Sequence, residues 1–418
     1  MGERDLDVVV FGATGITGRN VAAYLAERAP ETGAKWAAAA RDTAKLERLL
    51  GEMGVSAPET IVADLGDRDS LAAMASRARV VLNLVGPYTL YGRPVIEACV
   101  AGGAHYADVS GEMPFVRRMI DAFDARAREA GVKVVQVCGF ESLPPDLAIQ
   151  LAAERARERW DEGLADVDLQ LRMTGPSAMA QPSGGTLQTF AAVAGGDDAE
   201  RVADPAALVP DESLAAEIRR RSPLTIAPRR DQRGAVIVPM IPAPFINPAV
   251  IQRTNALLAA EDGGRGEPFR YREGMALDGS AASLPLRLAA ASAMAGTQAV
   301  MRSITRAGPS VRRPVARAME RILPSSGFGP TGEQLEGWEW RMTVEARTRG
   351  GHEVTVDVES EGHIGFLATA RMLGEAGLLL AEPGATPERA GCLTPATALG
   401  TASVDRFERA RLRFSVRA

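Results

Sequence analysis

The feature that most constrains the fold is a glycine-rich turn near the start of the chain. The apolar run Leu6–Phe11 precedes it, as expected for a strand buried on both faces of a parallel sheet. Gly12, Gly15 and Gly18 follow at three-residue spacing, and Arg19–Arg28 has a helical pattern. Gly12 permits a tight turn, Gly15 lets a pyrophosphate approach the backbone, and Gly18 lets helix and strand pack closely. The N–H groups that begin the helix would then face an anion.

Strand and helix patterns alternate through the first 137 residues. Six strands are expected, at Leu6–Phe11, Lys35–Ala40, Thr60–Ala63, Val80–Leu84, His105–Val109 and Val132–Val137. Because short right-handed crossovers permit little else, this alternation predicts a doubly wound parallel sheet, the Rossmann arrangement. The alternative, an ordinary strand–turn–helix with packing glycines, fits the surrounding elements less well. The predicted cofactor turn comprises Gly12, Ala13, Thr14, Gly15, Ile16, Thr17 and Gly18.

The end of the second strand indicates which dinucleotide binds. NAD-binding domains usually carry an acid here for the ribose 2′-OH, but this chain has Arg41, followed by Asp42, with Lys45 one turn further on. An Arg fork suits a 2′-phosphate, so we predict NADP. Asp42, an acid at this position, argues the other way, and a separate alternative is that Arg41 is a solvated loop residue. Asp64, after the third strand, is expected either to contact the adenine side or to cap a helix.

The loop after the fourth strand reads NLVGPYTLYG and is expected on the nicotinamide side of the crevice. The predicted cofactor contacts in it are Asn83, Val85, Gly86 and Pro87. A tyrosine hydroxyl beside a hydride donor can give a proton to substrate, and Tyr88 is the predicted catalytic residue. The alternative is that the rings of this loop only pack the cleft between domains.

Two further loops lie at the same edge of the predicted sheet. DVSGE follows the fifth strand and CGFESLPPD the sixth, bringing Glu112, Glu141 and Ser142 to the crevice. Both carboxylates have the alternative role of helix caps or buried hydrogen-bond acceptors. Cys138 has no nearby histidine in sequence, so a thiol nucleophile is not expected.

The rest of the chain follows a different pattern. Residues 165–173, 269–277 and 338–358 alternate apolar and polar side chains, which predicts antiparallel strands with one wet face. The expected fold is therefore α/β: an N-terminal Rossmann domain over residues 1–160 and a second α+β domain over 161–363. The second domain has a mainly antiparallel sheet and an irregular, Pro- and charge-rich insertion at 195–235. Residues 364–418 are expected to form a C-terminal helical segment that packs back on the Rossmann domain.

The composition indicates the cellular compartment of the protein and the kinds of partner that it can bind. The net charge of −5 gives no reason to expect nucleic acid. The three cysteines are scattered and odd in number, as in a reducing cytosol, and the three histidines lack zinc-like spacing, so no metal is expected. The chain opens with mixed charges rather than a signal-peptide pattern, and no run of about 20 apolar residues is present. We therefore expect a cytoplasmic protein.

An apolar stretch followed by arginines suggests contact with lipid. Residues 284–301 are the most apolar long stretch, and six arginines follow by residue 321. This order suits a peripheral interface with anionic lipid at the inner face of the membrane, formed by 284–321. The alternatives are a tunnel for an apolar substrate and a buried helix followed by a solvated Arg face. The apolar sheet face at 338–358 belongs either to the core or to a homodimer contact.

The motifs, taken in order, resemble a known family. GATGITG, AAARD, NLVGPYTLYG, YADVSGE and CGFESLPPDLA resemble the saccharopine dehydrogenase-like oxidoreductases, and most of all their trans-acting enoyl reductase branch. APFINPAVIQRTNALL and GCLTPATALG extend the similarity over most of the chain. Glu141 stands where the family pattern more often has Asp.

The resemblance implies NADPH-dependent reduction of a double bond in a polyketide or fatty-acyl intermediate of lipid biosynthesis. A hydride would go to the β-carbon of an enoyl group and a proton to the α-carbon. Two alternatives stay open. One is an amino-acid saccharopine-type dehydrogenase, which would need cationic side chains such as the Arg residues of 219–233. The other is a non-catalytic NADP-binding sensor or scaffold.

Overall fold

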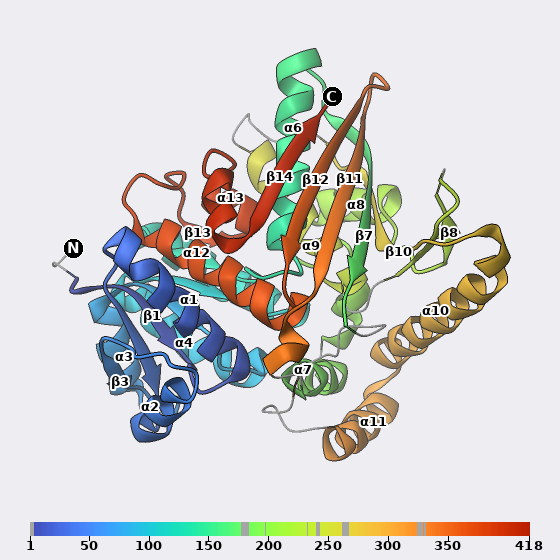
Figure 1. Cartoon of the computed structure of the whole chain (residues 1–418). Coiled ribbons are helices and arrows are strands. Elements are labelled where there is room, and N and C mark those ends of the chain that lie inside the picture. The colour runs from blue at the N-terminus through green and yellow to red at the C-terminus, as the bar shows by residue number, and fades with distance from the viewer. Residues whose placement is uncertain are drawn as a thin grey trace.

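Two seven-stranded sheets form the framework of this computed structural model (Figure 1). The structure describes residues 4–176, 184–196, 198–231, 233–239, 243–260, 267–323, 329 and 332–418.

The first sheet confirms the predicted parallel, doubly wound arrangement, and its strand order is β13-β6-β5-β4-β1-β2-β3. All of its strand pairs are parallel. The six expected strands are β1 (Leu6–Phe11), β2 (Trp36–Ala40), β3 (Thr60–Val62), β4 (Ala78–Asn83), β5 (His105–Asp108) and β6 (Lys133–Val135). The seventh, β13 (Gly391–Leu393), comes from the far end of the chain and pairs with β6.

Helices cover both faces of this sheet, which explains its continuous apolar strands. Val8 and Val10 of β1 belong to one buried cluster, and Val9 and Phe11 belong to another on the opposite face. The helices that follow the six strands are α1 (Ile16–Thr32), α2 (Thr43–Gly51), α3 (Arg68–Arg77), α4 (Tyr88–Gly102), α5 (Met113–Glu129) and α6 (Leu143–Trp160).

Helix α4 begins earlier than the sequence indicated. Residues 83–92 were expected to form a loop, but α4 begins inside this stretch, and Pro94 lies within the helix. Pro87 is the N-cap residue, so Tyr88 and Tyr91 stand in the first turn of α4 rather than in a loop. The carboxylate of Glu112, which is distant in sequence, accepts the first two N–H groups of the helix and so fixes this start.

The second sheet is mainly antiparallel, as predicted, and its order is β14-β12-β11-β7-β10-β9-β8. The exception is β7–β10, which pair in parallel because almost a hundred residues of crossover separate them. Its strands are β7 (Leu164–Thr174), β8 (Arg229–Arg230), β9 (Val236–Val238), β10 (Arg270–Leu277), β11 (Glu339–Thr348), β12 (Glu353–Glu361) and β14 (Leu412–Arg417).

The segment 364–418 is not only helical. After the short π-helix η5 (Ile364–Ala368), helix α12 (Thr369–Ala381) packs against α1 and β4, but β13 and β14 follow it and extend both sheets. One buried cluster runs continuously from Val8 of β1 to Val344 of β11. The domain boundaries expected at 160 and 363 therefore stay predictions, since the core itself does not divide there.

The stretch Ile364–Ala381 is long and apolar enough to cross a bilayer, with a mean hydropathy of 1.4, but 78% of it is buried inside the protein. Because η5 and α12 pack between the two sheets, we assign this stretch to the core.

The crossover between β7 and β11 carries most of the remaining helices. They are α7 (Gly184–Gly195), α8 (Glu212–Arg221), α9 (Asn247–Ala259), α10 (Leu284–Arg306) and α11 (Pro309–Ile322). The insertion at 195–235 is more regular than expected, because it contains α8, β8 and the 3₁₀ helix η1 (Ala199–Ala203). In Figure 1, α10 and α11 lie at the margin of the molecule, away from the first sheet. The short α13 (Pro395–Leu399) follows β13.

A buried ion pair joins α1 to α12. Glu375 is fully buried, and its Oε2 accepts hydrogen bonds from the Tyr24 hydroxyl at 2.5 Å and from Arg28 Nε at 3.4 Å. Arg406 Nε lies 3.3 Å from the other oxygen, Oε1. The carboxylate thus holds the C-terminal helix against the first helix of the chain.

We predict that Glu375→Ala lowers the free energy of unfolding by about 3 kcal/mol, because the buried Arg28 loses one of its two acidic partners, keeping only Glu31, and the buried Tyr24 hydroxyl loses its acceptor. Glu382→Ala is the matched control, since Glu382 pairs with the same Arg406 but is 53% exposed, and should cost about 1 kcal/mol or less. Urea denaturation followed by circular dichroism measures both. Equal losses in the two variants would contradict the assigned role of Glu375.

Candidate active site

The glycine turn joins β1 to α1 with very close contacts. Gly12 has a φ of +89°, a backbone conformation that favours glycine. A Cβ on Gly18 would lie 2.4 Å from the carbonyl oxygen of Gly12, and one on Gly12 would lie 2.8 Å from Val85 Cγ2. Gly12 and Gly18 are therefore required by the packing of the protein itself.

No close contact within the protein requires a glycine at position 15. Its backbone is extended at φ −75°, and a Cβ would meet only the Gly12 carbonyl oxygen, at an ordinary 3.5 Å. Gly15 is the N-cap of α1, no described side chain caps that helix, and no acid stands in its first turn. Uncapped N–H groups beside a residue without a side chain can receive a phosphate.

The end of β2 leaves Arg41 exposed beside Asp42. Asp42 Oδ1 accepts the Lys45 N–H at 2.9 Å and so caps α2, which assigns this acid to the helix rather than to a ribose. Arg41 is exposed, and its contact with a 2′-phosphate stays a prediction.

Asp64 does not cap a helix. It accepts the Gly66 N–H at 2.8 Å, while Asp67 caps α3. The role of Asp64 at the adenine side stays a prediction.

The loop after β4 starts a buried network. Asn83 is fully buried; its Oδ1 accepts the Val85 N–H at 3.1 Å, and its Nδ2 donates to the Tyr106 hydroxyl at 3.0 Å. Tyr106 in turn donates to Asp108 Oδ2 at 2.7 Å. Burial raises the pKa of Asp108 to about 7. The network fixes the backbone that leads to Gly86.

Tyr88 is 7% exposed, and its hydroxyl donates to the Asn83 carbonyl oxygen at 3.0 Å. Burial, together with the charge of Asp108, raises the pKa of Tyr88 well above its ordinary value. The hydroxyl must leave this bond before it can give a proton to substrate. Tyr88 as a proton donor stays a prediction.

Glu112 serves as a cap, one of the two roles that the sequence left open. Its two oxygens accept the N–H groups of Tyr88 and Thr89, each at 2.6 Å. The hydroxyl of Thr189 on α7 lies 3.5 Å from the Glu112 Oε1. Helix α7 of the crossover thus reaches the end of the loop that the sequence placed beside the nicotinamide.

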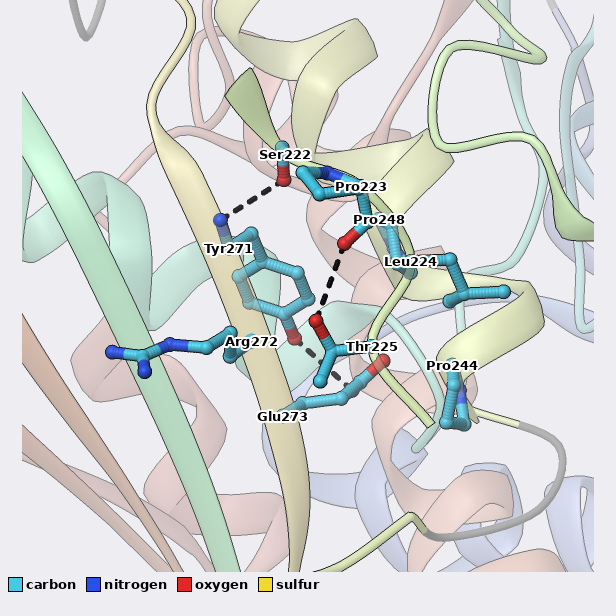
Figure 2. A pocket seen from close by; sticks show the side chains of 9 residues that line it. All are labelled: Ser222, Pro223, Leu224, Thr225, Pro244, Pro248, Tyr271, Arg272 and Glu273. Atoms are coloured by element: carbon cyan, nitrogen blue, oxygen red, sulfur yellow. Dashed lines mark hydrogen bonds between the residues drawn. The ribbon is translucent and has the colours of Figure 1, made fainter. Parts of the chain in front are cut away.

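The second sheet contributes polar groups that the sequence analysis did not identify. Glu273 of β10 accepts hydrogen bonds from Asn247 Nδ2 at 2.8 Å and from the Tyr271 hydroxyl at 3.0 Å. Ser142, after β6, donates to Asn247 Oδ1 at 2.8 Å. Figure 2 shows Tyr271 and Glu273 side by side on the wall of a pocket.

One signal in the sequence pointed to Glu273. In the alternating stretch 269–277, Glu273 has the same parity as Phe269 and Tyr271, so a carboxylate occurs on the apolar face of the strand. A charge at such a position is rarely tolerated without a partner or a function.

Comparisons with known proteins agree with this geometry. Residues 8–135 match the model of the saccharopine dehydrogenase NADP-binding domain. A trans-acting enoyl reductase of Mycobacterium ulcerans is 33% identical, with 97% of this chain and 96% of that protein covered. A putative trans-acting enoyl reductase of Mycobacterium tuberculosis gives the same identity and coverage.

Among solved structures, apo saccharopine dehydrogenase (L-Glu forming) from Saccharomyces cerevisiae aligns with 99% of this chain and all of that chain, at a TM-score of 0.52 and 12% identity. This likeness shows a shared fold. The cofactor is NADP, in agreement with the matched domain, and the cradle at Gly15 together with the exposed Arg41 fits its phosphates.

We predict that Gly15→Ala weakens NADPH binding at least about tenfold and leaves the melting temperature unchanged, because the new methyl fits the protein but occupies the phosphate cradle. Gly51→Ala is the control, since a Cβ there meets nothing within 4 Å. Isothermal titration calorimetry and thermal melts measure the two effects. Unchanged affinity in Gly15→Ala would place the phosphates elsewhere.

Proposed function

Because this chain belongs to the trans-acting enoyl reductase family of saccharopine dehydrogenase-like proteins, we propose that it reduces the carbon–carbon double bond of an enoyl intermediate with NADPH. The observation that carries the proposal is the open cradle at Gly15, within a chain that matches these reductases over almost its whole length. The proposed substrate is an acyl or polyketide-derived enoyl thioester made by another enzyme.

The residues of this chain have separable tasks in such a reaction. When bound, NADPH supplies the hydride for the β-carbon of the enoyl group. The first turn of α1 would hold the diphosphate, Arg41 the 2′-phosphate, and the Asn83–Pro87 loop the nicotinamide side. The α-carbon then requires a proton from an acid in the cleft.

The amino-acid dehydrogenase alternative loses part of its support. It needs cationic side chains available to substrate carboxylates, and the Arg residues of 219–233 were the candidates. Arg219 pairs with Asp204 at 2.8 Å, Arg221 with Glu217 at 3.0 Å, and Arg229 with Asp168. These three arginines are engaged by acids of the protein itself.

The function is tested with purified protein, NADPH and enoyl thioesters of N-acetylcysteamine, with keto and imine compounds for comparison. We expect NADPH oxidation with the enoyl compounds, and Arg41→Ala should lower the preference for NADPH over NADH by about tenfold or more. Arg48→Ala, an exposed arginine paired with Glu52 on the same helix, is the control. Tight NADPH binding without turnover of any compound would favour a sensor.

We also propose that α10 and α11 rest on an anionic membrane. Helix α10 turns Arg287, Gln298 and Thr305 inward, whereas Leu286 and Val300 are 74% and 59% exposed. A helix with its apolar side chains outward requires an apolar surface to cover them.

Arginines accompany this exposed apolar face. Arg306, Arg317 and Arg321 are exposed, and on α11 Val311 and Ile322 are 56% and 83% exposed. The protein as a whole carries −5, so the positive charge is concentrated on this part of the surface. Apolar side chains flanked by arginine match a lipid layer with anionic headgroups.

The position of these helices suits an apolar substrate. Helix α11 packs closely against α7, and Thr189 of α7 lies beside Glu112 in the cleft. A protein in the cytoplasm, peripheral to the inner face of the membrane, would thereby receive a substrate from lipid near its active site.

Sedimentation with vesicles of phosphatidylcholine and phosphatidylglycerol tests the membrane contact. We expect binding that fades with salt and is weakened by Arg317→Ala and Arg321→Ala, by about 1 kcal/mol each, and by Leu286→Ser. Arg409→Ala, exposed on the other side of the fold, is the control. Dimers detected by light scattering and abolished by Leu286→Ser would assign the face to a second copy and overturn the proposal.

A further inference from the structure

Helix α9 carries a buried arginine whose hydrogen bonds are incomplete. Arg253 is 5% exposed, and its two terminal nitrogens donate to the carbonyl oxygens of Leu208 at 3.3 Å and Cys392 at 3.2 Å. Its Nε is buried and has no hydrogen-bond partner among the described residues. Because buried donors rarely go unpaired, an acceptor belongs beside this nitrogen.

Gln136, directly after β6, presents a second donor of this kind. It is 4% exposed, and its Nε2 is buried without a partner in the part of the chain that the structure describes. Arg253 and Gln136 line the same cavity, together with Cys392 and Thr394 from the far end of the chain. One cavity thus brings together two unsatisfied N–H donors from distant segments.

The cavity suits a small ligand. It contains about 270 Å³ of empty space, whereas a water molecule takes up about 30 Å³ in the liquid. Much of its wall is apolar, with Val116 and Ile120 of α5 and Val250 of α9. The hydroxyl of Thr394 is already bonded to the hydroxyls of Thr254 and Thr397, at 2.6 and 3.0 Å. The unpaired polar atoms that characterise this cavity are therefore donors.

The acids around Arg253 do not balance the positive charge. Asp124 Oδ1 lies 3.7 Å from Arg253 Nη2, beyond hydrogen-bond distance, and Asp124 also pairs with Arg128 at 3.0 Å. Burial lowers the pKa of Arg253, and the charges of Arg128 and Arg117 act in the same direction. Arg117 itself is paired with Asp121 at 2.8 Å. These three arginines share two aspartates, which leaves one positive charge in excess.

No group in the wall of the cavity supplies the missing negative charge. None of the described residues that line it is an acid. Cys392 stays a neutral thiol, because burial raises its pKa to about 12. A water molecule satisfies unpaired donors but leaves the charge of Arg253 without a close partner. An anion supplies both the acceptor and the charge.

We propose that this cavity binds a small monovalent anion, such as chloride, between Arg253 Nε and Gln136 Nε2. Arg253 holds the backbone at Leu208 and at Cys392 of β13, so the bound anion stabilises the place where the crossover and the end of the chain meet. The site is independent of the proposed reductase function, since it rests on the packing around α9 and β13 alone.

Thermal melts in two sodium salts test the proposal. Chloride and gluconate are compared at about 0.2 M each, so that general screening is equal, and the hydroxyls of gluconate do not suit the apolar wall. Wild type should melt at least about 2 °C higher in chloride, because the anion binds only the folded chain. Arg155→Ala, at an exposed arginine paired with Glu158, is the control and should keep this difference. Equal melting of wild type in the two salts would overturn the proposal.

Two variants of Gln136 assign the effect to the cavity. Gln136→Leu removes one donor and should lose the difference between the salts. Gln136→Glu places a fixed carboxylate beside Arg253, so it should melt above wild type in gluconate and gain nothing from chloride. A chloride effect that persists in both variants would place the anion elsewhere and contradict the assignment.

Crystals soaked in sodium bromide locate the ion without any measurement of stability or turnover. We expect an anomalous peak in the cavity, in contact with Arg253 Nε and Gln136 Nε2. Density for water alone at this position, with no bromide signal, would show that water satisfies the two donors and would overturn the proposal.

Discussion

The contact between the first turn of α1 and the end of β1 is the constraint on which the rest of the structure depends. Helix α1 approaches β1 so closely that a Cβ on Gly18 would lie 2.4 Å from the Gly12 carbonyl oxygen. Only glycine therefore fits at position 18. This approach aims the uncapped N–H groups of α1 over the carboxyl edge of the sheet. The predicted phosphate position at Gly15 depends on this contact.

Several buried acids also stabilise the fold by accepting hydrogen bonds from the backbone or from side chains of other elements. Glu112 fixes the start of α4, Asp108 fixes the turns after β5 and β6, and Glu375 joins α1 to α12. Glu273 also keeps one buried oxygen, Oε1, without a hydrogen-bond partner among the described residues, as does Glu375, whose Oε1 lies 3.3 Å from Arg406 Nε in an ion pair. Buried acids whose oxygens accept backbone N–H groups hold the structure in place.

Much of the first sheet could be predicted from the sequence. The six strands, the glycine turn and the place of Arg41 are local patterns, set by apolar runs and by residues a few positions apart. The start of α4 was missed because Glu112, twenty-four residues away from Tyr88, supplies its cap. The strands β13 and β14 were missed because they are short and extend sheets built from distant segments.

The sequence by itself determined a NADP-type Rossmann domain followed by alternating strands, because side-chain period and glycine spacing are properties of the local chain. Only the tertiary structure decided that Glu375 meets Tyr24, that α10 turns Arg287, Gln298 and Thr305 inward, and that the end of the chain completes both sheets. These features arise from contacts that a local sequence pattern does not contain; Tyr24 and Glu375, for example, lie 351 positions apart. Local pattern carries no information on such contacts, because burial and the strength of a charge depend on everything that packs around the residue.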